Sequence, residues 1–167
     1  MTDQPDTPAL RALAESRTAH VVVRTRRAHS AEESAALQGI EPRQLFRTIV
    51  VRRGAADYLF VLVPAGRRFD WPKLRTHLGV SRMTLPDADE ARSVTGYERG
   101  AITPFGSATR LPVIVDASIG DLPLVALGGG AHGVNVHLAP ADLIAATGAE
   151  VVDVTEPETP EGSVAPA

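Results

Sequence analysis

A glycine-rich stretch, GGGAHG at residues 128–133, separates two segments that both have the composition of β-strands. Residues 123–127 read PLVAL, and residues 133–138 read GVNVHL, with an apolar side chain at every second position. Strands joined by so short a connection pair antiparallel, because a parallel pair needs a crossover of roughly a dozen residues or more. The pattern therefore argues against a doubly wound, wholly parallel sheet.

The same stretch matches the dinucleotide-binding pattern G-x-G-x-x-G through Gly128, Gly130 and Gly133. That pattern needs a helix after it, because N–H groups at the helix N-terminus bind the pyrophosphate. A strand follows here, so the glycines are predicted to form a turn between two strands. Such a turn still exposes backbone N–H groups that a ligand can approach closely.

Helical and extended patterns alternate along the rest of the chain. Besides the two segments above, helices are predicted at residues 8–17, 30–39, 71–78, 87–95 and 140–147, and strands at 20–25, 48–53, 58–63, 112–116 and 151–154. Asp70 and Asp87 are predicted to cap the helices that follow them.

Strands outnumber helices in this pattern, and several connections are too short for a crossover. The fold class is therefore predicted to be α+β, with a mixed, largely antiparallel central sheet flanked by helices. A single domain is expected over residues 8–155. Residues 1–7 and 156–167 are rich in proline and in acidic or small side chains, and we expect them to be disordered tails.

The composition excludes several kinds of chemistry. The chain has no cysteine, and therefore no disulfide, thiolate nucleophile or cysteine-based metal site. Its five histidines show no metal-ligand spacing, and no G-x-S-x-G motif indicates a serine hydrolase. No apolar run approaches the about 18 residues that span a bilayer, and the acidic start does not resemble a secretory signal. A cytoplasmic protein with no metal site and no membrane contact is expected.

The charge is unevenly distributed along the 167 residues, whose net charge is −3. Residues 11–53 contain nine arginines and four glutamates, an excess of five positive charges. One interpretation is a basic face that meets the phosphates of a nucleic acid. The other is a solvated surface in a chain whose basic residues are 16 arginines and one lysine. Composition alone leaves both open.

Two further segments are candidates for a site. In QLFRTIVVRRG, residues 44–54, Arg47 stands at the start of a strand between Phe46 and Thr48. It is either a solvated edge residue or a cation held where something anionic or polar binds. In GYERGAITPFG, residues 96–106, three glycines and a proline restrict the shape of a long loop, which is either a connection or part of a site.

Three segments together resemble the YbaK-type aminoacyl-tRNA deacylases, relatives of the editing domain inserted in bacterial prolyl-tRNA synthetases. These segments are LFRTIVV (45–51), TGYERGAITPFG (95–106) followed by RLPVIVD (110–116), and LGGGAHGVNVHLAPADL (127–143). The resemblance covers roughly residues 10–154. It implies a single domain with a mixed sheet, and hydrolysis of the ester that joins a wrong amino acid to the terminal adenosine of a tRNA. It also implies that no cofactor, metal or protein nucleophile takes part.

The resemblance also implies a set of site residues. Those matched to catalytic positions are Arg47, Gly100 and Pro104, and those matched to substrate-binding positions are Phe46, Thr48, Ile102, Thr103, Gly129, Gly130, His132 and Asn135. Three positions depart from the family. Arg47 replaces a lysine, Asn135 stands where many relatives carry an acidic residue, and Arg27 stands where some carry an aromatic residue.

The replacement at Arg47 leaves two functions open. An arginine keeps the positive charge but is bulkier, planar and always protonated. If the lysine acts through its charge, the chain is expected to be a trans-acting deacylase of Ala- or Cys-tRNA(Pro)-like substrates. If the lysine acts through its compact ammonium group, activity is reduced or redirected to another acyl ester or amide. The alternative is a non-catalytic module that binds aminoacyl-tRNA or a synthetase. The expected partner is the aminoacylated 3′ end of a tRNA.

Overall fold

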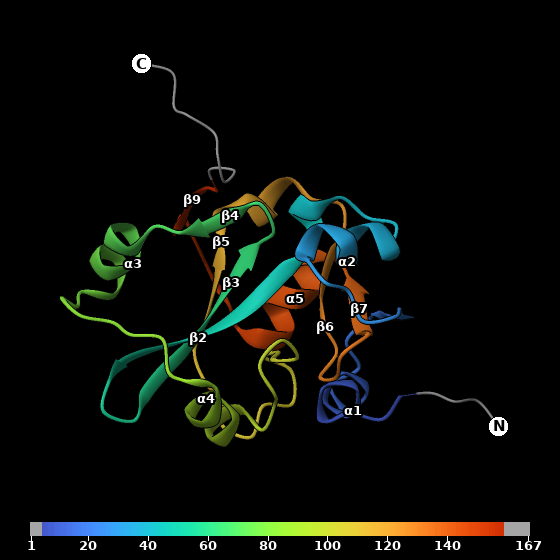
Figure 1. Ribbon diagram of the computed structural model, residues 1–167, viewed down its shortest axis with the longest axis horizontal. Coiled ribbons are helices and arrows are strands. Elements are labelled where there is room, and N and C mark those ends of the chain that lie inside the picture. The colour runs from blue at the N-terminus through green and yellow to red at the C-terminus, as the bar shows by residue number, and fades with distance from the viewer. Residues whose placement is uncertain (1–4, 159–167) are drawn as a thin grey trace, which may run out of the picture.

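The computed structural model describes residues 5–158, and Figure 1 shows how their helices and strands are arranged. The helices are α1 (Pro8–Glu15), α2 (Ala31–Leu37), α3 (Trp71–Leu78), α4 (Ala88–Thr95) and α5 (Pro140–Thr147), with two short 3-10 turns, η1 (Pro42–Gln44) and η2 (Ala117–Asp121). The strands are β1 (Val21–Arg24), β2 (Phe46–Gly54), β3 (Asp57–Pro64), β4 (Arg67–Phe69), β5 (Val113–Asp116), β6 (Val125–Gly128), β7 (Val134–Leu138), β8 (Glu150–Val152) and β9 (Thr155–Pro157).

Polar residues begin four of the helices, including α2, where the Ser30 hydroxyl accepts a hydrogen bond from the Glu33 N–H. The side-chain oxygens of Thr7, Asp70 and Asp87 accept a hydrogen bond from a backbone N–H in the first turn of α1, α3 and α4. Each cap satisfies a donor that has no partner inside its helix. The caps predicted at Asp70 and Asp87 are both present.

The strands form three sheets. A four-stranded sheet has the order β2-β3-β5-β8, a three-stranded sheet has the order β1-β7-β6, and β4 pairs with β9. The pairs β3/β5 and β5/β8 are parallel, and the other four pairs are antiparallel. The parallel pairs are joined through helices, whereas short turns join β2 to β3 and β6 to β7. The predicted α+β class is confirmed, and its central sheet is divided.

Side chains of β3 alternate between two apolar clusters, which explains why this strand is apolar throughout. Phe60 and Leu62 belong to a cluster shared with α1, α5 and the three-stranded sheet. Leu59 and Val61 belong to a second cluster, which Leu74 of α3 completes. Burial of each such side chain stabilises the folded state by about 1.5–3 kcal/mol. The four-stranded sheet is thereby covered on both faces (Figure 1).

The strands β2 and β6 meet at one end and diverge toward the other (Figure 1). A parallel bridge between Leu45 and Ala126 joins them at the end where they meet. Farther along β2, Arg52 forms an antiparallel bridge with Thr84. Between these two bridges, no strand within residues 5–158 covers the outer edge of β2. This divergence opens the space in which the candidate site lies.

The loop at residues 96–106 is held by contacts at both of its ends. The Tyr97 hydroxyl donates a hydrogen bond to the carbonyl oxygen of Phe105 at 2.7 Å. Gly106 has φ +64°, and a Cβ atom there would lie 2.3 Å from the carbonyl oxygen of Pro8. Glycine is therefore required at this position, because α1 begins directly against the loop.

The structure corrects both predicted tails at their inner ends. Thr7, assigned to the tail at residues 1–7, caps α1 and donates its hydroxyl hydrogen to the Gly129 carbonyl oxygen at 2.6 Å. Residues 156 and 157, assigned to the tail at 156–167, belong to β9. Strands of three residues, such as β4 and β9, show too little alternation to be recognised from sequence. Of the two predicted tails, residues 1–4 and 159–167 lie outside the described residues.

Candidate functional site

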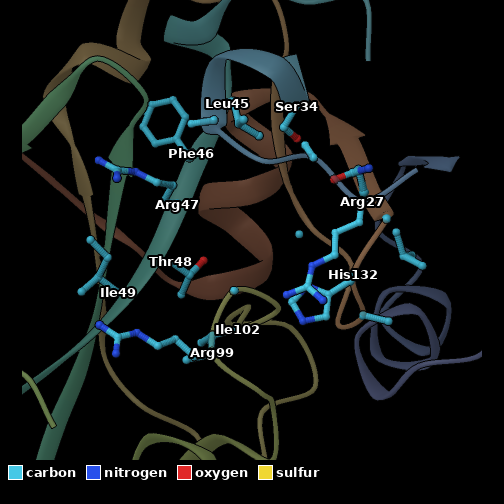
Figure 2. A pocket seen from close by; sticks show the side chains of 18 of the residues that line it. Arg27, Ser34, Leu45, Phe46, Arg47, Thr48, Ile49, Arg99, Ile102 and His132 are labelled. Atoms are coloured by element: carbon cyan, nitrogen blue, oxygen red, sulfur yellow. The ribbon is translucent and has the colours of Figure 1, made fainter. Parts of the chain in front are cut away.

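A cavity of about 620 Å³ opens between β2, β7 and the loops beside them (Figure 2). The three segments that carry the family resemblance all contribute to its wall, although they lie far apart in the sequence. Seven of the predicted site residues line it: Phe46, Arg47, Thr48, Gly100, Ile102, His132 and Asn135. A concave site of this size is large enough for a small organic ligand.

Successive side chains of β2 point to opposite sides of the strand. In Figure 2, Thr48 points to the side on which His132 lies, whereas Arg47 and Ile49 point to the other side. Phe46 is 1% exposed and belongs to the larger apolar cluster. The Thr48 side chain therefore lies on the cavity side of β2, while Arg47 lies at the rim.

The hydroxyl oxygen of Thr48 is buried and has no hydrogen-bond partner within residues 5–158. The backbone N–H and C=O of Thr48 also have no partner within residues 5–158, because only every second residue of an antiparallel edge strand bonds to the neighbouring strand. The Leu45 carbonyl oxygen accepts a hydrogen bond from the Ala65 N–H. The residues at every second position from Leu45 along β2 therefore bond to β3. Thr48 and Val50 belong to the other set, and their N–H and C=O groups point out of the sheet edge toward the cavity. These groups are suited to bind polar atoms of a ligand.

Arg47 is held at the rim by β4. Its guanidinium donates a hydrogen bond to the carbonyl oxygen of Arg67 at 2.9 Å. The Arg67 side chain in turn donates to the Thr155 hydroxyl at 2.7 Å and lies 4.0 Å from the buried Asp116 carboxylate. A guanidinium has five N–H donors, so Arg47 keeps donors available for an anion.

Gly100 and His132 face each other across one wall of the cavity. Gly100 has φ +91°, and a Cβ atom there would lie 3.1 Å from Cε1 of His132. The left-handed backbone favours glycine here, and a larger side chain would press against the imidazole. Nε2 of His132 also lies 3.8 Å from a carboxylate oxygen of Glu98. The 96–106 loop and the β6–β7 turn are thus packed together at the site.

Cationic side chains dominate the charge of the cavity. Within the described residues, its charged or titratable lining consists of Arg26, Arg27, Arg47, Arg99, His29 and His132, with no aspartate or glutamate. Arg26 is paired, because it donates a hydrogen bond to the Glu33 carboxylate. That hydrogen bond lowers the pKa of Glu33. In Figure 2, Arg27 points toward His132, and Arg99 runs below Thr48.

Arg27 and Arg99 were not among the predicted site residues. Arg27 entered the sequence analysis only as a departure from the family pattern. The sequence feature that could have indicated Arg99 as a cavity residue is its position directly before Gly100. For Arg27, the corresponding feature is the arginine excess of residues 11–53. Neither signal says which side chains turn inward, because that depends on how the loops pack.

Four predicted site residues do not line this cavity. Pro104 lines a separate cavity of about 250 Å³, which is formed in part by α1. Thr103 is fully buried. Gly129 and Gly130 form the turn between β6 and β7, where the Gly129 N–H donates to the carbonyl oxygen of Val134 at 2.7 Å. The contact of these four residues with a substrate stays a prediction.

Asn135 lies on β7 beside β1. Its side-chain nitrogen donates a hydrogen bond to the carbonyl oxygen of Val23 at 3.1 Å. Asn135 is 8% exposed and lines the cavity. Asn135 thus links two strands and presents an uncharged surface to the site.

The described residues contain no group of three or more histidines, aspartates or glutamates that could hold a metal ion. Among the same residues, no helix has the length and apolar character needed to cross a membrane.

A family model described as the aminoacyl-tRNA editing domain matches residues 25–146 of the chain. This range contains β2, the 96–106 loop and the β6–β7 turn. The match therefore includes every segment that builds the cavity.

The relatives include separate proteins and parts of synthetases. The chain is 24% identical over 129 residues to an Enterococcus faecalis protein with the provisional name Cys-tRNA(Pro)/Cys-tRNA(Cys) deacylase EbsC, covering 77% of this chain and 79% of that protein. It is 30% identical over 109 residues to the proline–tRNA ligase of Bacillus cytotoxicus, covering 64% of this chain and 19% of the ligase. A crystal structure provisionally described as a trans-editing enzyme for prolyl tRNA synthetase is 28% identical, with a TM-score of 0.81 over 92% of this chain and 99% of that one.

Proposed function

The chain belongs to the aminoacyl-tRNA editing domain family, and we propose that it is a trans-acting deacylase that hydrolyses the ester of a mischarged tRNA. The observation that carries this proposal is the cavity itself. Segments far apart in sequence form one cationic site with unpaired polar groups on β2. The name of one relative makes Cys-tRNA(Pro) the first substrate to test, and the family resemblance adds Ala-tRNA(Pro). Translation takes place in the cytoplasm, which is where we propose that the protein acts.

The proposed reaction is attack of water on the ester carbonyl carbon. Negative charge develops on the carbonyl oxygen, and the N–H groups and hydroxyl at the edge of β2 are placed to donate hydrogen bonds to it. Each well-aimed donor of this kind lowers the barrier by about 3 kcal/mol. The bond to the ribose oxygen then breaks, and that oxygen takes up a proton from the attacking water. The products are the free amino acid and a tRNA with its terminal hydroxyl restored.

The remaining predicted residues have distinct roles in this proposal. Arg47 at the rim binds a phosphate or polar oxygen of the tRNA 3′ end, where its charge attracts the nucleic acid. The wall formed by Gly100 and Ile102, which line the cavity, contacts the aminoacyl group. Rigid placement of the ester between this wall and β2 also reduces the entropy that is lost on reaching the transition state.

The test is a panel of mischarged tRNAs, beginning with Ala- and Cys-tRNA(Pro), in which release of the labelled amino acid is measured. We expect release above the buffer rate for at least one tRNA, and no release across the panel would contradict the proposal. For the active tRNA, Arg47→Ala should lower kcat/KM at least about tenfold, through loss of a charged hydrogen bond. Arg68→Ala, an exposed change on β4 outside the cavity, is the matched control. A wild-type rate for Arg47→Ala would remove Arg47 from the site.

A second candidate is a non-catalytic module that binds aminoacyl-tRNA or a synthetase. One observation favours it: the Arg47 guanidinium is hydrogen-bonded to the Arg67 carbonyl oxygen and lies on the opposite side of β2 from Thr48. Salt-dependent tRNA binding without turnover would support this candidate. Turnover of any mischarged tRNA would exclude it.

A further inference from the structure

The charge of the cavity restricts the acyl group that it can hold. Four arginines and two histidines line it, and no carboxylate within the described residues does so. Two acidic side chains contact residues of this lining without lining it themselves. Glu33 accepts a hydrogen bond from Arg26, and Glu98, whose side chain is 64% exposed, lies 3.8 Å from Nε2 of His132.

Among the described residues, two of the four arginines have no side-chain partner of any kind. Within residues 5–158, neither Arg27 nor Arg99 forms an ion pair or donates a side-chain hydrogen bond. Both line the cavity, Arg27 on the side of His132 and Arg99 below Thr48 and Ile49 (Figure 2). A guanidinium binds a carboxylate or a phosphate through two parallel hydrogen bonds, so each of these side chains fits one anionic group of a ligand.

The 3′ end of a tRNA supplies one anion close to the ester, the phosphate of the terminal nucleotide. An alanyl or cysteinyl group adds only the positive charge of its α-ammonium group, which no carboxylate in the cavity balances. An acyl group with a carboxylate side chain supplies the second anion. Its ammonium group can donate to the free carbonyl oxygens on the edge of β2, where Thr48 and Val50 point outward.

We propose that the cavity selects an aspartyl or glutamyl ester, with the side-chain carboxylate bound by Arg99 and the terminal phosphate bound by Arg27. Arg99 is assigned to the acyl group because it belongs to the 96–106 loop, next to Gly100 and Ile102. Arg27 is assigned to the phosphate because it comes from the opposite wall, in the arginine-rich segment after β1. This assignment rests on the proposed function, and it makes Ala and Cys poorer acyl groups than Asp.

The experiment uses amide-linked analogues of 3′-aminoacyl adenosine 5′-phosphate, which cannot be hydrolysed. Aspartyl and asparaginyl analogues have almost the same shape and differ in charge, and alanyl and N-acetylalanyl analogues complete the set. Binding to the full chain is measured by titration calorimetry at low salt. We expect the aspartyl analogue to bind at least about tenfold more tightly than the asparaginyl one, as a charged bidentate pair implies.

Variants identify the side chain responsible. Arg99→Gln should remove the preference for the aspartyl analogue, and Arg99→Lys should restore part of it, because lysine keeps the charge without the planar fork. Arg27→Gln should weaken all four analogues by a similar factor. Arg82→Gln, an exposed arginine outside the cavity, should change nothing. Thermal melting of each variant checks that the fold is retained.

Several outcomes would overturn the assignment. These are asparaginyl or alanyl binding as tight as aspartyl binding, tighter binding of the N-acetylalanyl analogue, a preference that survives Arg99→Gln, and binding of none of the four. The measurement needs no turnover, so an inactive panel of mischarged tRNAs leaves it intact. Conversely, hydrolysis of Ala-tRNA without an aspartyl preference would refute the assignment of the acyl group and still support the proposed deacylase function.

Discussion

Thr48 combines a buried hydroxyl that has no partner among residues 5–158 with a backbone at the outer edge of β2. A buried polar atom left unpaired costs about 1–3 kcal/mol of folding free energy. The fold tolerates this cost at the wall of the candidate site, where a ligand atom can take the place of the missing partner. Ser107 has the second hydroxyl of this kind among residues 5–158, and it lies outside the larger cavity.

The two hydroxyls allow a matched prediction. Thr48→Val removes the unpaired oxygen at nearly constant volume, and Ser107→Ala removes the other. We expect both variants to melt at a temperature equal to or above that of the wild type, because a buried unsatisfied group is lost. Thr48→Val should also lower kcat/KM for the active mischarged tRNA at least about tenfold, if its hydroxyl donates to the transition state. Equal activity of the two variants would contradict a ligand-binding role for Thr48.

At the scale of elements, the 96–106 loop is positioned by buried contacts at its ends, and not by regular secondary structure. Tyr97 is 4% exposed, and its hydroxyl reaches the Phe105 carbonyl oxygen across the loop. Burial raises the pKa of Tyr97 to about 12. The phenol therefore stays protonated and able to donate at every pH at which a tRNA substrate would be tested.

Tyr97→Phe removes this donor and leaves the Phe105 carbonyl without it. We expect the free energy of unfolding to fall by about 1–3 kcal/mol and to do so equally from pH 6 to pH 9. Because the folded pKa is raised, the wild type keeps this contribution below the ordinary pKa of about 10 and loses it as pH rises through about 12. Chemical denaturation at several pH values measures both effects.

The control for this change is Tyr58→Phe. The Tyr58 hydroxyl donates to the Glu90 carboxylate near the surface, where water can replace the bond. The loss of stability should be smaller than for Tyr97→Phe. A loss at Tyr97 that is no larger than the loss at Tyr58 would contradict the anchoring role of the Phe105 contact.

At the scale of the whole molecule, a chain with net charge −3 places four arginines and two histidines around one cavity, with no carboxylate among the described residues that line it. Local charge, and not net charge, decides whether an anionic strand is attracted to a site. The divergence of β2 and β6 makes this concentration possible, because it brings the loop after β1 and the 96–106 loop to the same opening.

Salt dependence tests this view. We expect the affinity for an RNA strand that ends in the tRNA 3′ sequence to fall as salt rises. The slope of log K against log salt should become shallower by about 0.7 for each phosphate contact that is lost. Arg27→Gln should make the slope shallower by about 0.7, the value for one lost phosphate contact, and Arg82→Gln should leave the slope unchanged. Binding that does not depend on salt would contradict a phosphate-binding role for the cavity.

Much of the fold and part of the site could be predicted from the sequence. Period-two alternation and apolar runs identified most strands, and Asp70 and Asp87 were correctly predicted as helix caps. The strand after GGGAHG excluded a dinucleotide-binding loop, and the motifs around Thr48 and Gly100 indicated the segments that line the cavity. Each of these signals depends on a few neighbouring residues, and their spacing along the chain is enough to predict the face or turn that they form.

The tertiary structure decided what meets in the cavity. Where β2 leaves β6, which of two adjacent residues on β2 faces inward, and which arginines lack a partner all depend on packing between distant segments. Thus Thr48 turns inward and Arg47 is held at the rim, although they are neighbours in the chain. Arg27 and Arg99 became site residues for the same reason, because sequence periodicity defines a local element but not the loops packed against it.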